Sequence, residues 1–249
     1  MQFLDCNCMV GQPLAPLGWR EYDPACLQKI AESCGVSGTF ACHTAALEVH
    51  PTIGNEAIQQ VTQQFPFFSP VWVVMPNATG EFYDPPVLLQ HMKAVGVRMV
   101  RLAPAEQALR HSVSEWACGE LLQLLEEARI PVLLDALQIP WDELHNLAGA
   151  HPKLPIIITN LYYRDARDLI ALMQCHSNLY AESSGMKAFQ LLQGFCEQVG
   201  AERVVFGSNA GCYSVGSAVC MVTYAAITQQ EKEQIAAQNL RRLLERVVL

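Results

Sequence analysis

Several polar side chains that could do chemistry stand at the ends of short apolar runs in this sequence. They are Asn7, Arg101, Asp135, Asn160, Glu182 and Asn209. A carboxylate can accept or deliver a proton, an amide can donate and accept hydrogen bonds, and a guanidinium can pair with a carboxylate. If the apolar runs are parallel barrel strands, these side chains gather at one end and line a site for a small molecule, with Asp135 as the candidate catalytic carboxylate.

Arg101 is the clearest candidate for a binding residue. A charge near the end of a buried strand is costly unless it is paired or faces a wet cavity. Arg101 could therefore hold the carboxylate of a ligand, with the asparagine amides orienting the rest of that molecule. It could equally form a structural ion pair with Asp135 or Glu182, and the sequence leaves both interpretations open.

The seven histidines add one more catalytic candidate. His43 ends an apolar run, where barrel enzymes carry catalytic residues, so it could act as a general base. The alternative, which we favour, is that His43 only forms a hydrogen bond within a loop. We expect the remaining histidines, in loops or helices, to be solvated; they are His50, His91, His111, His145, His151 and His176.

The elements that must position these side chains alternate along the whole chain. The candidate strands are Phe3–Met9, Gly38–His43, Pro70–Met75, Arg98–Ala103, Pro131–Asp135, Pro155–Asn160, Asn178–Ser183 and Arg203–Ser208. Between them, apolar residues recur at helical spacing, as at Leu121, Leu124 and Leu125. The nearly continuous apolar run Pro155–Ile158 is typical of a strand buried on both faces, as in a parallel sheet covered by helices.

This alternation predicts an α/β fold of the (β/α)8 TIM-barrel type, with residues 1–249 forming a single domain. An open doubly wound sheet would show the same alternation. However, the sequence contains neither the G-x-G-x-x-G nor the G-x-x-x-x-G-K-[ST] motif expected of its common nucleotide-binding versions. Eight strand and helix units also match a barrel better.

Composition restricts the class of protein further. Apolar residues make up 51% and charged residues 16% of the chain, which is typical of a well-buried globular fold. A net charge of -8 without a basic cluster excludes a nucleic-acid footprint and favours a small-molecule ligand. No apolar stretch approaches the roughly 18 to 20 residues that a membrane span needs. Because the N-terminus also lacks a signal peptide, we expect a cytoplasmic protein whose ten cysteines are free.

A set of short motifs runs in order through the chain. Asp5–Gly11 is similar to D-x-H-x-H-x-G without its histidines, His50–Glu56 to P-x-x-G-N-E, Gly96–Leu102 to G-x-x-G-[IV]-K-L, Ile130–Asp135 and Leu154–Asn160 to strands that end in histidine, Asn178–Ser184 to N-[LV]-Y-x-[DE]-x-S, Arg203–Asn209 to R-[IV]-L-F-G-S-D, and Asn239–Leu244 to N-x-x-R-L-L. The set resembles the amidohydrolase-related family of the metal-dependent hydrolase superfamily, which includes aminocarboxymuconate-semialdehyde decarboxylase-like enzymes.

The resemblance implies a metal site that this sequence has altered. In the family, imidazoles and a carboxylate hold a metal, typically zinc, which lowers the pKa of bound water. The corresponding positions here are Asn7, Met9, Asp135, Asn160 and Asn209. Amide and thioether groups are poor zinc ligands. We therefore expect no cofactor, and zinc or another divalent metal only if this interpretation of a degenerate site is wrong.

Thiolates could replace the missing imidazoles, because Cys6 and Cys8 flank two of the altered positions. Alternation along a strand argues against it. If Asn7 and Met9 point into the barrel, then Cys6 and Cys8 should point outward.

Two functions remain open. The resemblance implies a hydrolase-like or decarboxylase-like enzyme that acts on a small carboxylated molecule at the C-terminal barrel face. The altered ligand positions favour instead a noncatalytic barrel that binds a small anionic molecule or a protein partner. A homodimer is compatible with the resemblance, since barrels of this family often dimerise through helices.

Overall fold

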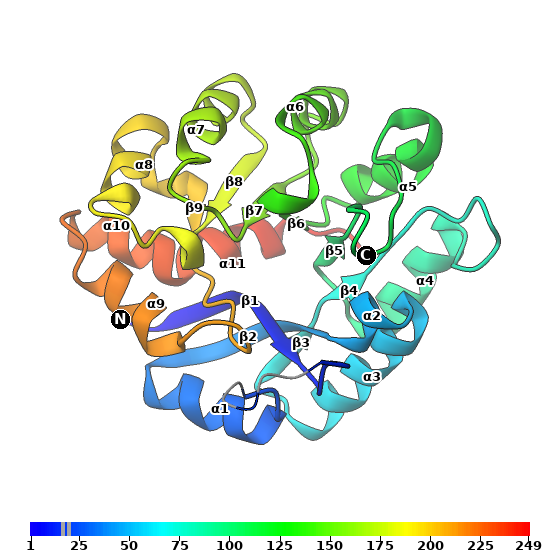
Figure 1. Cartoon of the computed structure of the whole chain (residues 1–249), viewed down its shortest axis with the longest axis horizontal. Coiled ribbons are helices and arrows are strands. Elements are labelled where there is room, and N and C mark those ends of the chain that lie inside the picture. Colours follow the sequence, from blue (N-terminus) through cyan, green and yellow to red (C-terminus); the bar gives the residue numbers. More distant parts are fainter. Residues whose placement is uncertain (16–17, 19–20) are drawn as a thin grey trace.

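The computed structural model describes residues 1–15, 18 and 21–249, and these contain nine parallel strands with helices outside them (Figure 1). The strands are β1 (Phe3–Val10), β2 (Val36–His43), β3 (Phe68–Pro70), β4 (Trp72–Val73), β5 (Val100–Leu102), β6 (Val132–Asp135), β7 (Ile156–Thr159), β8 (Leu179–Glu182) and β9 (Val204–Val205). Because β3 and β4 belong to one extended segment, every predicted strand is found, although most are shorter than predicted.

The strands form two hydrogen-bonded ladders, one of β1 to β3 and one of β4 to β9 in chain order. The ladder changes at Val71, whose N–H donates to the carbonyl of Ala41 at 2.8 Å. Just beyond it, the side chain of Asn55 donates to the carbonyl of Val73 at 2.8 Å and accepts from the N–H of Val73 at 2.9 Å. One amide side chain therefore takes the place of a neighbouring strand where the ladder is broken.

The two ladders also meet on their other side, between β1 and the segment that follows β9. The N–H of Cys6 donates to the carbonyl of Phe206 at 3.1 Å, and the N–H of Met9 donates to the carbonyl of Ala210 at 2.9 Å. Together with the continuous chain through Val71, these bonds join the two ladders at both edges. The strands surround a common centre in Figure 1, and the predicted TIM-type barrel is confirmed.

Helices follow the strands and cover their outer faces. They are α1 (Pro24–Ser33), α2 (Ala45–Glu48), α3 (Pro51–Gln64), α4 (Pro85–Val95), α5 (Glu115–Glu127), α6 (Trp141–Ala150), α7 (Ala166–Cys175), α8 (Leu191–Val199), α9 (Val215–Thr223), α10 (Gln229–Glu233) and α11 (Asn239–Glu245), with short turns η1 (Ala136–Gln138), η2 (Ser183–Gly185), η3 (Ala201–Arg203) and the π-helical η4 (Gln234–Gln238). Proline occupies the first position of α1, α3 and α4, where its missing N–H costs nothing. None of the described helices has the length and apolar character needed to cross a membrane.

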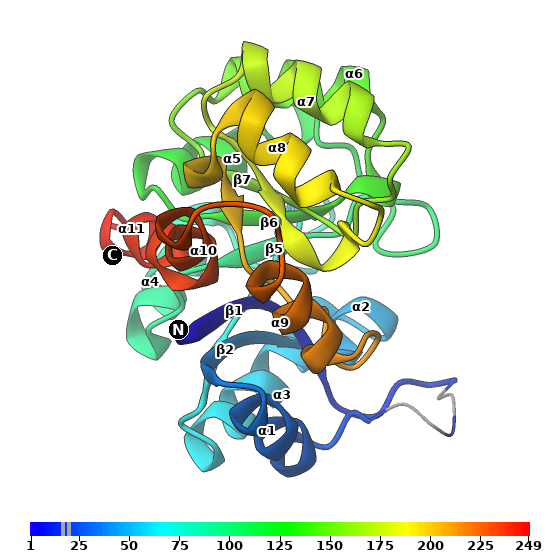
Figure 2. The same cartoon turned by 90° about the vertical axis from the view of Figure 1, so that its left-hand side faces the viewer.

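Strand alternation divides the apolar side chains into two cores. Leu133, Ile157 and Val205 pack in an inner core within the barrel, whereas their strand neighbours pack outward against the helices. Leu240 and Leu243 of α11 also belong to the inner core, so α11 closes the barrel end at which the strands begin. Figure 2 shows α11 on the same side as the N-terminus. The carboxyl ends of the strands are left as the end that can hold a polar site.

A bulge in β1 corrects one prediction about side-chain direction. Asp5 pairs with Thr39 and Cys8 pairs with Ala41, so two residues of β1 stand opposite one residue of β2. Cys8 packs in the outer core as predicted, but Cys6 packs in the inner core, and its predicted outward direction is wrong. Bulges commonly re-aim side chains at barrel rims, and this one directs two successive residues, Cys6 and Asn7, inward.

The close packing of α2 against α3 can be tested at Gly54, the glycine of the His50–Glu56 segment. A Cβ at Gly54 in α3 would lie 2.1 Å from the backbone nitrogen of Ala46 in α2. We expect Gly54→Ala to lower the free energy of unfolding by about 1–3 kcal/mol, because the two helices must separate. The measurement is equilibrium urea denaturation.

The matched control is Gly194→Ala in α8, where an added Cβ meets nothing within 4 Å. Its free energy of unfolding should rise by about 0.5–1 kcal/mol from helix propensity and the smaller entropy of the unfolded chain. The close α2–α3 approach would be contradicted if both variants were stabilised.

Candidate functional site

Five of the six polar side chains predicted from strand ends are connected by hydrogen bonds at the carboxyl end of the barrel. They are Asn7 of β1, Arg101 of β5, Asp135 at the end of β6, Asn160 directly after β7 and Glu182 at the end of β8. Strand alternation explains their common direction, since Arg101, Asp135 and Glu182 each follow an inner-core residue by two positions. We call these five residues the mouth cluster.

Hydrogen bonds between side chains connect one half of the mouth cluster across the barrel. Arg101 donates from Nη2 to Oδ1 of Asn7 at 2.6 Å, and Asn7 donates from Nδ2 to Oε2 of Glu182 at 3.4 Å. The same glutamate oxygen accepts the backbone N–H of Asn160 at 3.5 Å. The Asn7 amide therefore links the guanidinium to a carboxylate without bringing the two charges into contact.

Asn160 connects the other half of the mouth cluster. Its Nδ2 donates to Oδ2 of Asp135 at 3.2 Å, and its Oδ1 accepts from the hydroxyl of Tyr213 at 3.2 Å. Asn160 has a φ of 57°, in the left-handed region that asparagine tolerates better than most side chains. Tyr213 could not be predicted from the sequence, because it stands in the loop after β9, outside any strand-end motif.

Glu182 is fully buried, and burial raises the pKa of its carboxyl while hydrogen bonds oppose the rise. The strongest of these bonds come from Ser184, whose N–H and hydroxyl both donate to the carboxylate, at 2.5 and 2.8 Å. A Cβ at Gly207 would lie 2.3 Å from Oε1 of Glu182. Glycine at position 207 thus leaves the space that the glutamate occupies.

Asp135 is the more accessible carboxylate of the mouth cluster. Its Oδ1 accepts the N–H of Leu137 at 2.9 Å, which caps the η1 turn. Burial raises the pKa of Asp135, and the Leu137 hydrogen bond and the Arg101 charge act in the opposite direction. A carboxyl with a raised pKa can hold and deliver a proton.

Arg101 is 6% exposed, and it forms no ion pair within 4.0 Å with Asp135 or Glu182 in the described part of the chain. The direct ion pair considered from the sequence is therefore not formed. Its Nε is buried without a hydrogen-bond partner among the described residues. Close to the guanidinium lies the thiol of Cys42, whose pKa is raised by burial and lowered by the Arg101 charge.

Asp5 supports the mouth cluster through its hydrogen bonds to the backbone of Asn7 and to Ser208, a role that was not predicted from the sequence. Its Oδ1 accepts the N–H groups of Asn7 at 3.0 Å and Ser208 at 2.9 Å, and the Ser208 hydroxyl donates to Oδ2. These bonds stabilise the β1 bulge and tie it to the segment after β9. Burial raises the pKa of Asp5 to about 7, although its hydrogen bonds act to lower it.

The other two predicted site residues are not part of the hydrogen-bond path through the described residues. His43 accepts the N–H of Ala45 at Nδ1, at 3.2 Å, and partial burial lowers its pKa. A Cβ at Gly11 would lie 2.1 Å from Nε2 of His43, so this ring packs beneath the loop after β1. Asn209 has a φ of 51°, and its carbonyl accepts the N–H of Tyr213 at 2.9 Å. It positions the loop that carries Tyr213.

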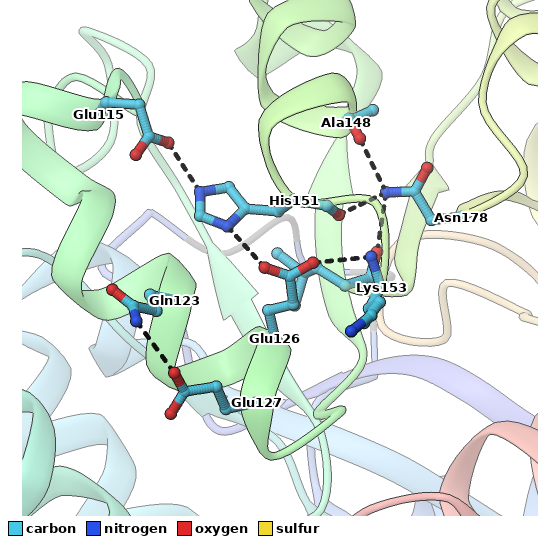
Figure 3. Close-up of polar contacts among 9 residues, drawn as sticks. Glu115, Gln123, Glu126, Glu127, Ala148, His151, Lys153 and Asn178 are labelled. Carbon is cyan, nitrogen blue, oxygen red and sulfur yellow. Dashed lines mark hydrogen bonds and ion pairs between the residues drawn. The ribbon is translucent and has the colours of Figure 1, made fainter.

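A second polar cluster lies outside the barrel and corrects the expectation that His151 is solvated. His151 is buried, with Nε2 2.7 Å from Oε1 of Glu115 and Nδ1 3.1 Å from Oε2 of Glu126 (Figure 3). Glu126 also accepts the N–H of Lys153 at 2.7 Å. These contacts tie α5 to the turn before β7, at the barrel end opposite the mouth, where conserved interactions of such folds serve stability.

The side-chain oxygens at the mouth that could bind a metal already accept hydrogen bonds within the protein. Asn7 Oδ1 accepts from Arg101, Asn160 Oδ1 accepts from Tyr213, and both oxygens of Asp135 accept N–H groups. Within the residues that the structure describes, no group of three or more histidine, cysteine, aspartate or glutamate side chains is arranged to hold a metal ion.

Comparison with known proteins places the chain in a wider context. A family model described as Amidohydrolase matches residues 45–246. Among solved structures, 2,6-dihydroxybenzoate decarboxylase from Rhizobium superposes with a TM-score of 0.76 and 14% sequence identity, over 98% of this chain and 99% of that one. An uncharacterized TIM-barrel protein from Bordetella bronchiseptica superposes with a TM-score of 0.72 and 15% identity, over 99% of both chains.

A third similar structure contains ligands. It is a dihydroxybenzoic acid decarboxylase from Polaromonas sp. JS666 with bound manganese and the inhibitor 2-nitroresorcinol, with a TM-score of 0.71 and 13% identity over 98% of this chain and 97% of that one. Identities this low establish the shared fold rather than a shared reaction. No curated protein matches the sequence.

Asp5 generates a test of the electrostatics beneath the mouth. A carboxyl whose pKa rises from 3.8 unfolded to about 7 folded binds more protons in the native state. Its contribution to stability is therefore complete below pH 3.8 and is lost as the pH rises through 7, with a slope of at most about 1.4 kcal/mol per pH unit. Asp5→Asn keeps an oxygen for the two N–H donors and should flatten this decline in the free energy of unfolding.

The measurement is urea denaturation at intervals between pH 4 and pH 8, with exposed Asp168→Asn as the control that removes the same formal charge. Parallel profiles of the wild type and Asp5→Asn would show that Asp5 is ionised across the range and would contradict the raised pKa.

Proposed function

The chain belongs to the amidohydrolase family, and on that premise we propose that its barrel mouth binds a small carboxylated molecule at Arg101, without a bound metal. The ligand carboxylate accepts hydrogen bonds from the guanidinium. The amides of Asn7 and Asn160 orient the polar groups of the ligand, next to the carboxyls of Asp135 and Glu182.

The observation that carries this proposal is the state of the Arg101 guanidinium. It is almost fully buried, it has no carboxylate within 4.0 Å in the described part of the chain, and its Nε lacks a partner there. A buried charge with an unsatisfied donor costs several kcal/mol relative to water. An anionic ligand supplies both the missing acceptor and the missing counter-charge.

A metal fits these residues poorly. A divalent cation needs oxygen, nitrogen or thiolate donors that are free to turn toward it. Here the Asn7 oxygen faces Arg101, and the oxygens of Asp135 and Asn160 accept hydrogen bonds from their neighbours. The guanidinium would also repel a second cation at the mouth.

The names of structural relatives support the ligand class. A 2,6-dihydroxybenzoate decarboxylase has been solved in complex with 2,6-dihydroxybenzoate, and a 5-carboxyvanillate decarboxylase from Sphingomonas paucimobilis shares the fold with a TM-score of 0.67. Both compounds are carboxylated aromatic rings. A benzoate-like acid is accordingly the first ligand class to test with this chain.

Decarboxylation is a second candidate function, and the raised pKa of Asp135 favours it. When a carboxylate leaves as CO2, the electron pair of the broken bond stays on carbon, and a proton must be delivered there. Asp135 could supply that proton and take another from water. His43 forms no hydrogen bond with the mouth cluster among the described residues, so a role as a base would require the loop at Gly11 to move. Release of CO2 distinguishes this function from binding alone.

The binding proposal predicts a specific loss in Arg101→Met, which removes the charge but keeps an unbranched apolar side chain. The dissociation constant for benzoate should rise by about 10- to 100-fold, because a charge-assisted hydrogen bond contributes roughly 1.5–3 kcal/mol. Calorimetric titration with benzoate measures it. The control is Arg167→Met, on the exposed surface of α7.

Thermal unfolding of both variants must accompany the titration. A folded Arg101→Met protein that binds benzoate as tightly as the wild type would refute the proposed function. An unfolded variant would assign Arg101 to stability instead, which also refutes the proposal.

Because the side chains of the mouth cluster fit a metal poorly, we expect the purified protein to retain neither zinc nor manganese in stoichiometric amount. Each missing imidazole removes a bond and part of the site geometry, so affinity should fall far below that of a complete site. Elemental analysis after dialysis without chelator provides the measurement. One equivalent of metal that disappears in Asp135→Ala would show that the mouth is a working metal centre.

A further inference from the structure

A second cation stands at the rim of the mouth, on the segment that follows η2. The ammonium of Lys187 lies 3.0 Å from the centroid of the Tyr213 ring, well within the range of a cation–π contact. In the described part of the chain it forms no ion pair within 4.0 Å. Burial lowers the pKa of Lys187, and the charge of Glu182 opposes this effect. Lys187 is thus partly desolvated and faces the side of the barrel that holds the mouth cluster.

Tyr213 connects this cation to the inner residues. Its hydroxyl donates to Oδ1 of Asn160 at 3.2 Å, and Asn160 donates in turn to Asp135 at 3.2 Å. The carbonyl of Asn209 accepts the N–H of Tyr213 at 2.9 Å and fixes the backbone of the loop. The ring on which Lys187 rests is therefore held from both its ends, and the position of the ammonium depends on residues of the mouth cluster.

We propose that Lys187, resting on Tyr213, forms an outer anion subsite, so that the ligand held by Arg101 carries a second anionic group and is, as a class, a small dicarboxylate. This inference rests on the proposed function, because it assumes that the first carboxylate lies at Arg101. One anionic group reaches the buried guanidinium, and the other pairs with the exposed ammonium at the rim.

The two cations differ in a way that suits two anionic groups of one ligand. Arg101 is 6% exposed, and its planar fork can hold a carboxylate in one orientation. Lys187 is an exposed point charge on a flexible side chain, so it tolerates some variation in the position of the second group. Strand β5 fixes the position of Arg101, and the contacts of Tyr213 fix that of Lys187. The site should therefore select ligands by the distance between their two anionic groups.

The experiment compares three probes, namely benzoate, isophthalate and terephthalate, by calorimetric titration of the full chain. We expect one of the two dicarboxylates to bind the wild type about tenfold more tightly than benzoate, as a second charge-assisted contact should give. In Lys187→Met this advantage should disappear while benzoate affinity stays unchanged. Lys187→Arg should restore most of it, because the positive charge returns to the same position.

The matched control is Lys93→Met, which removes the same charge from the last turn of α4, at the other end of the barrel. It should leave all three affinities unchanged. An equal loss of the dicarboxylate advantage in Lys93→Met would show that net charge, rather than a subsite, sets the preference, and would overturn the inference.

The outer subsite and the proposed function are refuted by different results. If the wild type binds benzoate in an Arg101-dependent way but shows no preference for either dicarboxylate, the outer subsite is refuted and the proposed function stands. If benzoate binding does not depend on Arg101, or does not occur, the proposed function fails and the inference fails with it.

Discussion

The burial of one guanidinium inside the barrel is the constraint on which the rest of the mouth depends. Arg101 stands on a strand whose neighbours are filled with apolar side chains, and its charge has to be compensated within a few ångströms. The protein compensates it indirectly, because Asn7 accepts from the guanidinium with its oxygen and donates to Glu182 with its nitrogen. An amide can do both at once, since it carries an acceptor and a donor on one planar group. Asn160 does the same between Tyr213 and Asp135.

The residues through which the chain resembles its family have mostly structural duties. Asn55 replaces a missing strand beside Val73, and Asn178 donates to the carbonyls of Ala148, His151 and Leu154. Arg203 and Asn239 likewise hold backbone carbonyls where strands and helices meet. Such contacts serve the barrel whatever reaction it carries out. Asn7, Asp135 and Asn160, at which the sequence departs from the motifs that it resembles, lie instead at the mouth, so the residues that hold the fold are distinct from those that line the candidate site.

This separation explains how far the sequence could be interpreted. Alternating apolar runs predicted the barrel, and strand alternation predicted that Arg101, Asp135 and Glu182 lie at one end of it. Both predictions succeeded because they depend on local periodicity. The direction of Cys6 was mispredicted, since the bulge depends on hydrogen bonds that Asp5 accepts from the N–H of Asn7 and from that of the distant Ser208. Tyr213 and Lys187 could not be found either, because loop geometry, rather than spacing along the chain, brings them together. The burial of His151 likewise arises from tertiary contacts with α5.

The charges at the mouth also determine how it can respond to an anion. Asp5, Asp135 and Glu182 all have raised pKa values, and burial is the largest cause in each case. Each proton held on these carboxyls leaves the Arg101 charge less compensated, and therefore more attractive to an incoming carboxylate. An ionised Asp135 or Glu182 competes with that ligand for the same guanidinium, through space or through Asn7. Ligand binding and proton uptake at these carboxyls are consequently linked. An anion at Arg101 raises the pKa values of the carboxyls further, because a like charge nearby disfavours their ionisation. The effective charge of the mouth therefore changes with the protonation of its own carboxyls.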